Sequence, residues 1–214
     1  MIKNKLFESY AMGENCYVVS DSSGEAVIID CGSFTKEEFQ AIADYISSEG
    51  LTPVHQLCTH FHFDHVMGLQ YVFDAYGLQP EGSPLDEDLY DNVNNQLQLF
   101  SMGRKVDFRR LDLGRKLIDG NQILFGQHAL QVIHTPGHSR GGLCFYCKEE
   151  GTLWSGDTLF RDSIGRTDLP GGDYRQLIGS IRNRLFCLPD ATKVYPGHGP
   201  STTLAYEKAY NPYI

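Results

Sequence analysis

The feature that most constrains this chain is a run in which four side chains of the metal-binding type fall within six residues, His60 to His65. Imidazole nitrogen and carboxylate oxygen are ligands for Zn²⁺ and similar divalent ions. His60 and His62 would point to one side of an extended chain, whereas the adjacent Asp64 and His65 would diverge unless the chain turns. An apolar strand pattern (54–58) precedes the run and a helical pattern follows it. The run is therefore expected at a strand-to-helix turn, where two metal ions could lie side by side.

Three further candidate ligands stand in turns rich in Gly or Pro farther along the chain. Each follows a short apolar run typical of a strand, and Pro and Gly would fix a turn there that exposes the polar side chain. Loops that leave a rigid sheet are where catalytic groups are usually presented. The candidate metal ligands are therefore His60, His62, Asp64, His65, His138, Asp157 and His198.

The histidines could instead have structural roles or bind metal only loosely. An isolated histidine is usually a surface or core residue, and a His-rich tract can bind metal through composition alone. Here the spacing is not a simple repeat, ordered elements frame the run, and further ligands follow. The other histidines, His55, His128 and His134, are interpreted as structural. Metal-bound imidazoles usually donate their other N–H, and Thr59 and Ser139 are candidates for that support.

The combined pattern resembles the metallo-β-lactamase superfamily: H-x-H-x-D-H, a His after T-P-G, the Asp of S-G-D and the His of P-G-H-G. The match spans about residues 10 to 200. Within the superfamily the chain resembles short bacterial hydroxyacylglutathione hydrolases of the glyoxalase II type. Asp157 disfavours true β-lactamases, whose usual pattern has Cys there. The closest likeness to the short subgroup lies in Asp157–Phe160, Ser163–Asp168 and Pro170–Asp173.

This resemblance implies a fold and a chemistry. The fold would be a four-layer αββα sandwich, formed by a single domain over residues 1–214 without the C-terminal helical region that helps full-length glyoxalase II bind glutathione. The activity would be that of a dinuclear-metal hydrolase, in which a metal-bridging hydroxide attacks a thioester such as S-lactoylglutathione. Asp64 and Asp157 would be catalytic. One ion would be held by His60, His62 and His138, the second by Asp64, His65 and His198, and Asp157 would bridge them.

The identity of the metal is less constrained than its ligands. Zn²⁺ is the default for a site rich in histidine, while Fe or Mn can also occupy mixed His/Asp sites. Metal analysis would therefore separate the hydrolase from its main alternative. That alternative is a persulfide dioxygenase, which resembles the same fold but uses one Fe(II) held by two His and an Asp. In this chain those ligands would be His60 or His62 together with His138 and Asp157. Lactone or ester hydrolysis and a non-enzymatic, metal-stabilised binding module also stay open.

Two features bear on the substrate. Arg166 lies just past Asp157, where its guanidinium could engage a substrate carboxylate or form an ordinary salt bridge. The stretch from Pro80 to Asp107 carries no candidate ligand and is rich in Asn and Gln. We expect residues 86–100 to be helical and favour a solvated insertion; the alternative is a cover over the metal site.

The charge and composition limit which partners and which cellular location are expected. A net charge of −9 argues against a nucleic-acid partner and leaves a small molecule as the expected one. No apolar stretch follows the first five residues and no run approaches membrane-spanning length, so neither a signal peptide nor a membrane partner is expected. Six cysteines without regular spacing indicate free thiols in a reducing cytoplasm. Cys144 and Cys147 lie in a predicted strand and face opposite sides, which favours packed thiols over a metal pair.

The remaining local signals alternate between strands and helices. Residues 16–20 and 26–29 predict a hairpin across a polar turn. Thr35 and Glu38 form a capping-box pattern that opens a helix, and Gly50 ends it. Asp173 can cap a later helix. Periodicity by itself indicates only an α/β protein.

Overall fold

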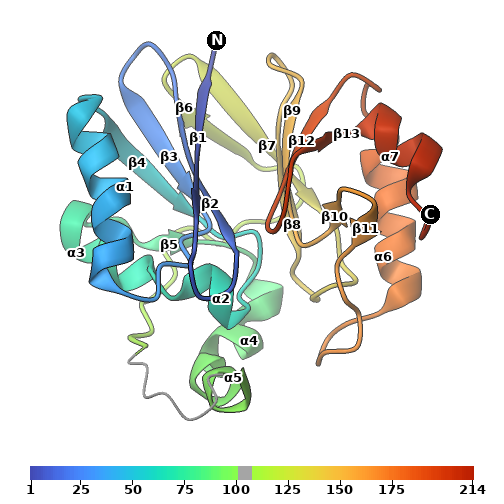
Figure 1. Cartoon of the computed structure of the whole chain (residues 1–214), viewed down its shortest axis with the longest axis horizontal. Helices are drawn as coiled ribbons and strands as arrows, with labels where there is room; N and C mark the ends of the chain where they lie inside the picture. Colours follow the sequence, from blue (N-terminus) through green and yellow to red (C-terminus); the bar gives the residue numbers. More distant parts are fainter. Residues whose placement is uncertain (101–107) are drawn as a thin grey trace.

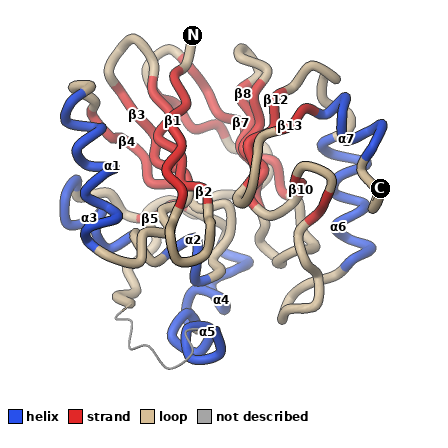
Figure 2. Tube along the Cα trace, in the orientation of Figure 1, coloured by secondary structure: helices blue, strands red, loops and turns tan. Residues whose placement is uncertain are grey.

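Two sheets stack face to face, and helices cover the outer face of each (Figure 1). The computed structural model describes residues 1–100 and 108–214, without the side chain of Phe100. The first sheet has the order β1-β2-β3-β4-β5 and the second β13-β12-β9-β8-β7-β6. Figure 2 shows the two layers of strands between helices on either side, which confirms the αββα sandwich.

The strands are short, and their bounds are as follows. The first sheet contains β1 (Lys3–Glu8), β2 (Asn15–Ser20), β3 (Glu25–Ile29), β4 (Thr52–Leu57) and β5 (Pro80–Glu81). The second contains β6 (Gln122–Phe125), β7 (His128–His134), β8 (Leu143–Cys147), β9 (Thr152–Gly156), β12 (Lys193–Pro196) and β13 (Thr202–Thr203). A separate hairpin is formed by β10 (Leu159–Phe160) and β11 (Ser163–Ile164).

The helices fall into three groups. The outer face of the first sheet carries α1 (Lys36–Ser48) and α3 (Leu69–Tyr76), and that of the second carries α6 (Tyr174–Ser180) and α7 (Leu204–Tyr210) (Figure 1). The π-helical turn Ile181–Leu185 continues α6. The third group lies at one end of the sandwich: α2 (Phe63–Val66), the 3₁₀ turn Pro84–Asp86, α4 (Glu87–Asp91) and α5 (Val93–Phe100).

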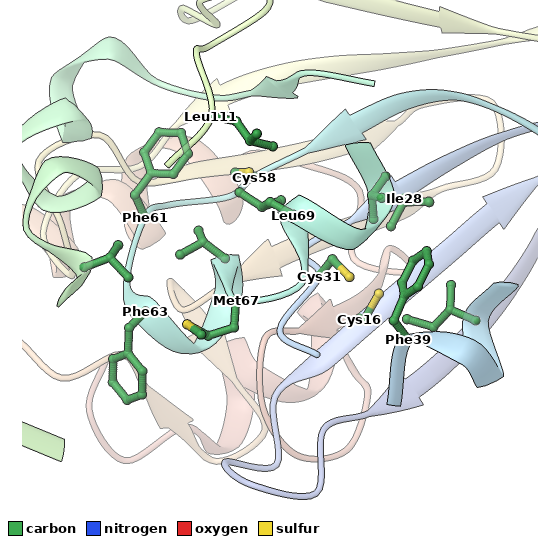
Figure 3. Close-up of a cluster of buried hydrophobic side chains, with 14 of the residues drawn as sticks. Cys16, Ile28, Cys31, Phe39, Cys58, Phe61, Phe63, Met67, Leu69 and Leu111 are labelled. Carbon is green, nitrogen blue, oxygen red and sulfur yellow. The ribbon is translucent and has the colours of Figure 1, made fainter. Parts of the chain in front are cut away.

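Apolar side chains on alternate faces of the strands form three buried clusters. Val18 and Ile28 face the helices of the first layer, while their neighbours Val19 and Val27 face the second sheet. Side chains in a strand point alternately to opposite faces, so each sheet supplies two cores. Figure 3 shows the helix-side cluster with Phe39 of α1 among its members. The cluster between the sheets includes Leu57, Phe145 and Trp154, and the third cluster lies under α6 and α7.

The predicted local signals are confirmed. β2 and β3 pair as an antiparallel hairpin. Thr35 and Glu38 form a capping box at the start of α1, and Gly50 follows the helix with a positive φ of 62°. The Asp173 carboxylate accepts a hydrogen bond from the Gln176 N–H at the start of α6. These devices satisfy backbone groups that a helix terminus leaves without partners.

The cysteines behave as predicted, whereas one expectation about the middle of the chain is wrong. All six cysteines are free, and Cys144 and Cys147 pack in different cores on opposite faces of β8. Residues 86–100 are largely helical as expected, but they are not a solvated insertion, because Tyr90 and Val93 are fully buried in the first core. Their apolar side chains outweigh the polar average of the segment. Of the longer stretch from Pro80 to Asp107, residues 101–107 lie outside the described residues. No helix in the described ranges is long and apolar enough to span a membrane.

Candidate metal centre

The seven predicted ligands converge at one end of the sandwich. His60 and His62 leave the end of β4, and Asp64 and His65 belong to the short helix α2 that follows. The second sheet contributes the other three from the loops after β7, β9 and β12. These three strands run in the same direction, so their carboxyl ends meet at one edge of the sheet. The loops after β7, β9 and β12 carry His138, Asp157 and His198.

The first cluster consists of three buried imidazoles, those of His60, His62 and His138. Nδ1 of His62 lies 2.8 Å from Nε2 of His138, which in turn lies 3.2 Å from Nε2 of His60. A neutral imidazole has one donor and one acceptor nitrogen. Nδ1 of His138 donates to the Arg166 carbonyl and Nδ1 of His60 donates to the Thr59 hydroxyl, so the two Nε2 atoms face each other as acceptors without a donor between them. A cation among the three imidazoles would satisfy these nitrogens, and the donor set suits Zn²⁺ or Fe.

A second cluster is formed by Asp64, His65 and His198. Nε2 of His198 lies 3.3 Å from Oδ2 of Asp64. The Asp157 carboxylate lies between the clusters: Oδ1 is 3.4 Å from Nε2 of His65, and Oδ2 is 3.5 Å from Nε2 of His138. Oδ1 of Asp157 and Nε2 of His65 are buried without a hydrogen-bond partner. A cation beside them would satisfy both atoms, which is the arrangement expected of a metal site.

Four of the five histidines in the two clusters are oriented by a hydrogen bond from Nδ1, on the side of the ring away from the cluster. An acceptor at Nδ1 holds the proton there and leaves the Nε2 lone pair free for a metal. His62 differs, because it presents Nδ1 to the cluster. The four pairs are His60 with Thr59 Oγ1 (3.0 Å), His65 with Asp30 Oδ2 (3.0 Å), His138 with the Arg166 carbonyl (2.8 Å) and His198 with the Gly13 carbonyl (3.1 Å).

Asp30 was not among the predicted residues. Its buried carboxylate accepts hydrogen bonds from the backbone N–H and the hydroxyl of Thr59, both at 2.7 Å, as well as from His65. The expectation for Thr59 is supported, because its hydroxyl faces His60. Ser139 instead donates to Asp86. The sequence offers one signal for Asp30, a carboxylate at the end of an apolar strand, and that signal is common to many loops.

The protonation states suit metal binding. Burial lowers the pKa of His60 well below its usual value and that of His62 to about 3. Burial opposes ionisation of Asp157, but His65 and the other imidazoles around it outweigh that effect and hold its pKa well below its usual value. Burial likewise opposes protonation of His65, yet the carboxylates of Asp157, Asp64 and Asp30 raise its pKa well above the ordinary value. Positive charge is therefore favoured at this position, and a metal ion would supply it.

The centre opens into a pocket of about 730 Å³. The segment that carries α4 and α5 contributes Leu85, Leu89 and Leu99 to the pocket lining, and the β10–β11 hairpin contributes Phe160 and Ile164. The described part of the stretch from Pro80 to Asp107 therefore lines the pocket over the candidate metal centre, which agrees with the hypothesis that this stretch covers the site. A largely apolar pocket with a few convergent polar groups is typical of a small-molecule site.

Arg166 borders the same pocket, but its guanidinium is occupied. Its Nε and an Nη nitrogen donate to the two carboxylate oxygens of Asp168 at 2.7 and 2.8 Å. Its carbonyl accepts the His138 bond. The three other histidines stay outside the two clusters: His55 bonds Glu81, His128 lies between Asp21 and Glu150, and His134 bonds the Arg140 carbonyl.

Comparison with known proteins gives one family and several full-length relatives. A family model described as the metallo-beta-lactamase superfamily matches residues 10–198. A hydroxyacylglutathione hydrolase, GloC, of Haemophilus influenzae is 33% identical over 205 residues, which cover 95% of this chain and 94% of the relative. The crystal structure of the B3 metallo-beta-lactamase BLEG-1 aligns with a TM-score of 0.88 and 34% identity over 100% of this chain and 99% of its own. The di-iron-bound form of TTHA1623 aligns with a TM-score of 0.86 and 38% identity over 98% and 100%.

Proposed function

The chain belongs to the metallo-beta-lactamase superfamily and is one of its metal-dependent hydrolases, and we propose that it holds two divalent ions and cleaves a thioester such as S-lactoylglutathione. Zn²⁺ is the metal that the histidines favour, with Fe or Mn as alternatives. The crystal structure of TTHA1623 is that of a di-iron-bound form, which supports iron as a candidate metal for this chain.

The observation that carries the proposal is the position of Asp157 between two three-residue clusters. His60, His62 and His138 would hold the first ion, and Asp64, His65 and His198 the second. The two oxygens of Asp157 face His65 on one side and His138 on the other, so one carboxylate reaches both clusters. A carboxylate between two cations offsets part of their mutual repulsion.

The metal ions and their protein ligands would have different roles in catalysis. Two divalent ions held here would supply a hydroxide nucleophile near neutral pH and a Lewis acid for the carbonyl oxygen. Asp64 and Asp157, the two residues that we assign as catalytic, are kept ionised beside the histidines and hold the geometry of the centre. The thiol released has a pKa of about 8.5 in the free state, so it leaves with little need for an acid. GloC, the hydroxyacylglutathione hydrolase, supports a substrate of this class.

Arg166 is proposed as a contact for the substrate through its position on the pocket wall. Its guanidinium would have to share its donors between Asp168 and the substrate, because both oxygens of Asp168 now accept from it.

A direct assay tests the function. Protein loaded in parallel with Zn²⁺, Fe²⁺ or Mn²⁺ is given S-lactoylglutathione, and loss of the thioester is followed together with metal content. The expected result is turnover that requires about two ions per chain and that a chelator abolishes. A fully loaded protein without turnover would rule out S-lactoylglutathione as the substrate. Inactivity with every other substrate of the panel below would favour a non-enzymatic metal-stabilised module.

The same preparations separate the other candidate reactions. A persulfide dioxygenase would need one iron per chain, with two His and Asp157 as ligands, and would consume O₂ on glutathione persulfide. A lactone, a simple ester and a β-lactam complete the substrate panel. The β-lactam is included because BLEG-1, described as a β-lactamase, aligns over this whole chain, so Asp157 alone does not exclude that activity.

A further inference from the structure

We propose that Arg140 binds a carboxylate of the substrate and makes the pocket selective for anionic ligands. The substrate class rests on the proposed function, whereas the binding role of Arg140 can be tested without any reaction. Arg140 lies two residues after His138 and borders the same pocket as His138 and Asp157.

The backbone of Arg140 is fixed on both sides. The buried Asp86 carboxylate accepts from the hydroxyl of Ser139 and from the backbone N–H of Gly141, both at 2.6 Å. Nε2 of His134 lies 2.9 Å from the carbonyl oxygen of Arg140. The loop that presents His138 to the metal centre therefore also holds Arg140 in a defined place, which reduces the entropy that binding would cost.

The side chain of Arg140, in contrast, is left without a polar partner. Its guanidinium is exposed and makes no hydrogen bond or ion pair with any residue in the described ranges. Its aliphatic stem lies along Gly171, where an added Cβ would be 3.4 Å from Cγ of Arg140. The loop thus supports the stem and leaves five N–H donors free.

The amide side chains on the pocket wall are already engaged. Gln96 accepts from the Phe63 N–H and donates to the Leu89 carbonyl, and Asn92 donates to the Asp88 carbonyl. Arg140 and Arg166 are the two Lys or Arg side chains on the described lining, and Arg166 is paired with Asp168. Arg140 is therefore the unengaged cation of the described lining.

The charge around the pocket explains why a free guanidinium would favour anionic ligands. The chain carries a net charge of −9, and Asp88 on the pocket lining is a carboxylate that no proposed metal ion would neutralise. An anionic group of a ligand that lies away from the metal ions would meet repulsion from this acidic surface unless a cation faces it. A guanidinium matches a carboxylate with two parallel hydrogen bonds, which a neutral ligand cannot use.

The test compares two ligands without a thioester, S-hexylglutathione and its diethyl ester, in which both carboxylates are esterified, by calorimetry on metal-loaded protein. Wild-type protein should bind the free acid at least about tenfold more tightly than the diester. Arg140→Met keeps the stem and should weaken binding of the free acid by about 10- to 100-fold, the range of a charged hydrogen bond, while binding of the diester stays unchanged. Arg140→Lys should fall between the two.

Arg161→Met is the matched control, because Arg161 is an exposed arginine outside this pocket that pairs with Asp162. It should bind both ligands as the wild type does. The inference is overturned if wild-type protein shows no preference for the free acid, or if Arg140→Met keeps that preference or weakens both ligands alike. Since the ligands are thioethers, a failure of thioester hydrolysis would leave this readout intact.

Discussion

His65 and Asp30 form a buried pair behind the metal centre, with Nδ1 of His65 3.0 Å from Oδ2 of Asp30 and both side chains at most 2% exposed. The same carboxylate accepts from the hydroxyl of Thr59, which faces Nδ1 of His60. One residue therefore orients a proposed ligand of each ion, directly in one cluster and through Thr59 in the other. Groups that orient metal ligands set the tautomer and basicity of the imidazole.

Replacing Asp30 with Asn should weaken the binding of both metal ions, and that of the second ion more. The amide cannot accept from His65 and both Thr59 groups as the carboxylate does, so a loss of about 10- to 100-fold in metal affinity is expected. Competition with a chromophoric chelator measures each ion. Thr59→Val is the matched variant, since it removes only the hydroxyl that faces His60 and should affect mainly the first ion. Wild-type affinities in Asp30→Asn would contradict this role.

Asp157→Ala should lower the occupancy of both ions, whereas His198→Ala should mainly release the second. The reason is position, because Asp157 faces both clusters and His198 belongs to one. Elemental analysis after dialysis gives the number of ions per chain. Equal losses in the two variants, or normal content in Asp157→Ala, would argue against a bridging carboxylate.

Gly197→Ala should disturb the centre without removing a ligand. A Cβ at this position would lie 2.3 Å from Oδ1 of Asp157 and 2.7 Å from Cε1 of His65, so both side chains, or the backbone of Gly197, must move. We expect lower metal content and a loss of activity of at least about tenfold, since misplacement by about 1 Å can cost 100-fold. Gly179→Ala in α6 is the control, because an added Cβ there would lie 3.9 Å from the side-chain nitrogen of Asn183, an ordinary contact, and the metal content should not change.

His55 should make the stability of the metal-free protein depend on pH. Its hydrogen bond with Glu81 raises the pKa of His55 above the usual value, despite the opposing effect of burial. The protonated form is therefore favoured in the folded state, so its contribution is complete below about pH 6.5, the value in the unfolded chain, and is lost as the pH rises through the raised pKa. Urea unfolding at several pH values, compared with His55→Gln, measures this contribution.

Glu81→Gln gives an independent check on the same pair. It removes the charge that favours protonated His55, so the difference from wild type should show the same dependence on pH. Two variants whose destabilisation is equal at pH 5 and at pH 8 would refute the coupling.

Local patterns were enough to predict much of the fold. The hairpin of β2 and β3, the capping box at Thr35 and the cap at Asp173 all depend on residues within a few positions of one another. The helices of residues 86–100 were predicted for the same reason. Their burial was not, because it depends on Tyr90 and Val93 packing in a core formed by distant strands. The polar average of that segment concealed those two side chains.

The seven side chains that gather at the proposed metal centre could be predicted from the sequence, because ligand chemistry, spacing and strand-end turns are local properties. The groups that orient them could not, because they come together only in the folded protein. Asp30 is 35 positions from His65, and the Gly13 carbonyl is 185 positions from His198, so these pairs form only when the sheets fold and stack. The Arg166–Asp168 pair is local, two positions apart in the chain. The place of Arg140 on the pocket wall, with no polar side-chain partner among the described residues, depends on the fold instead.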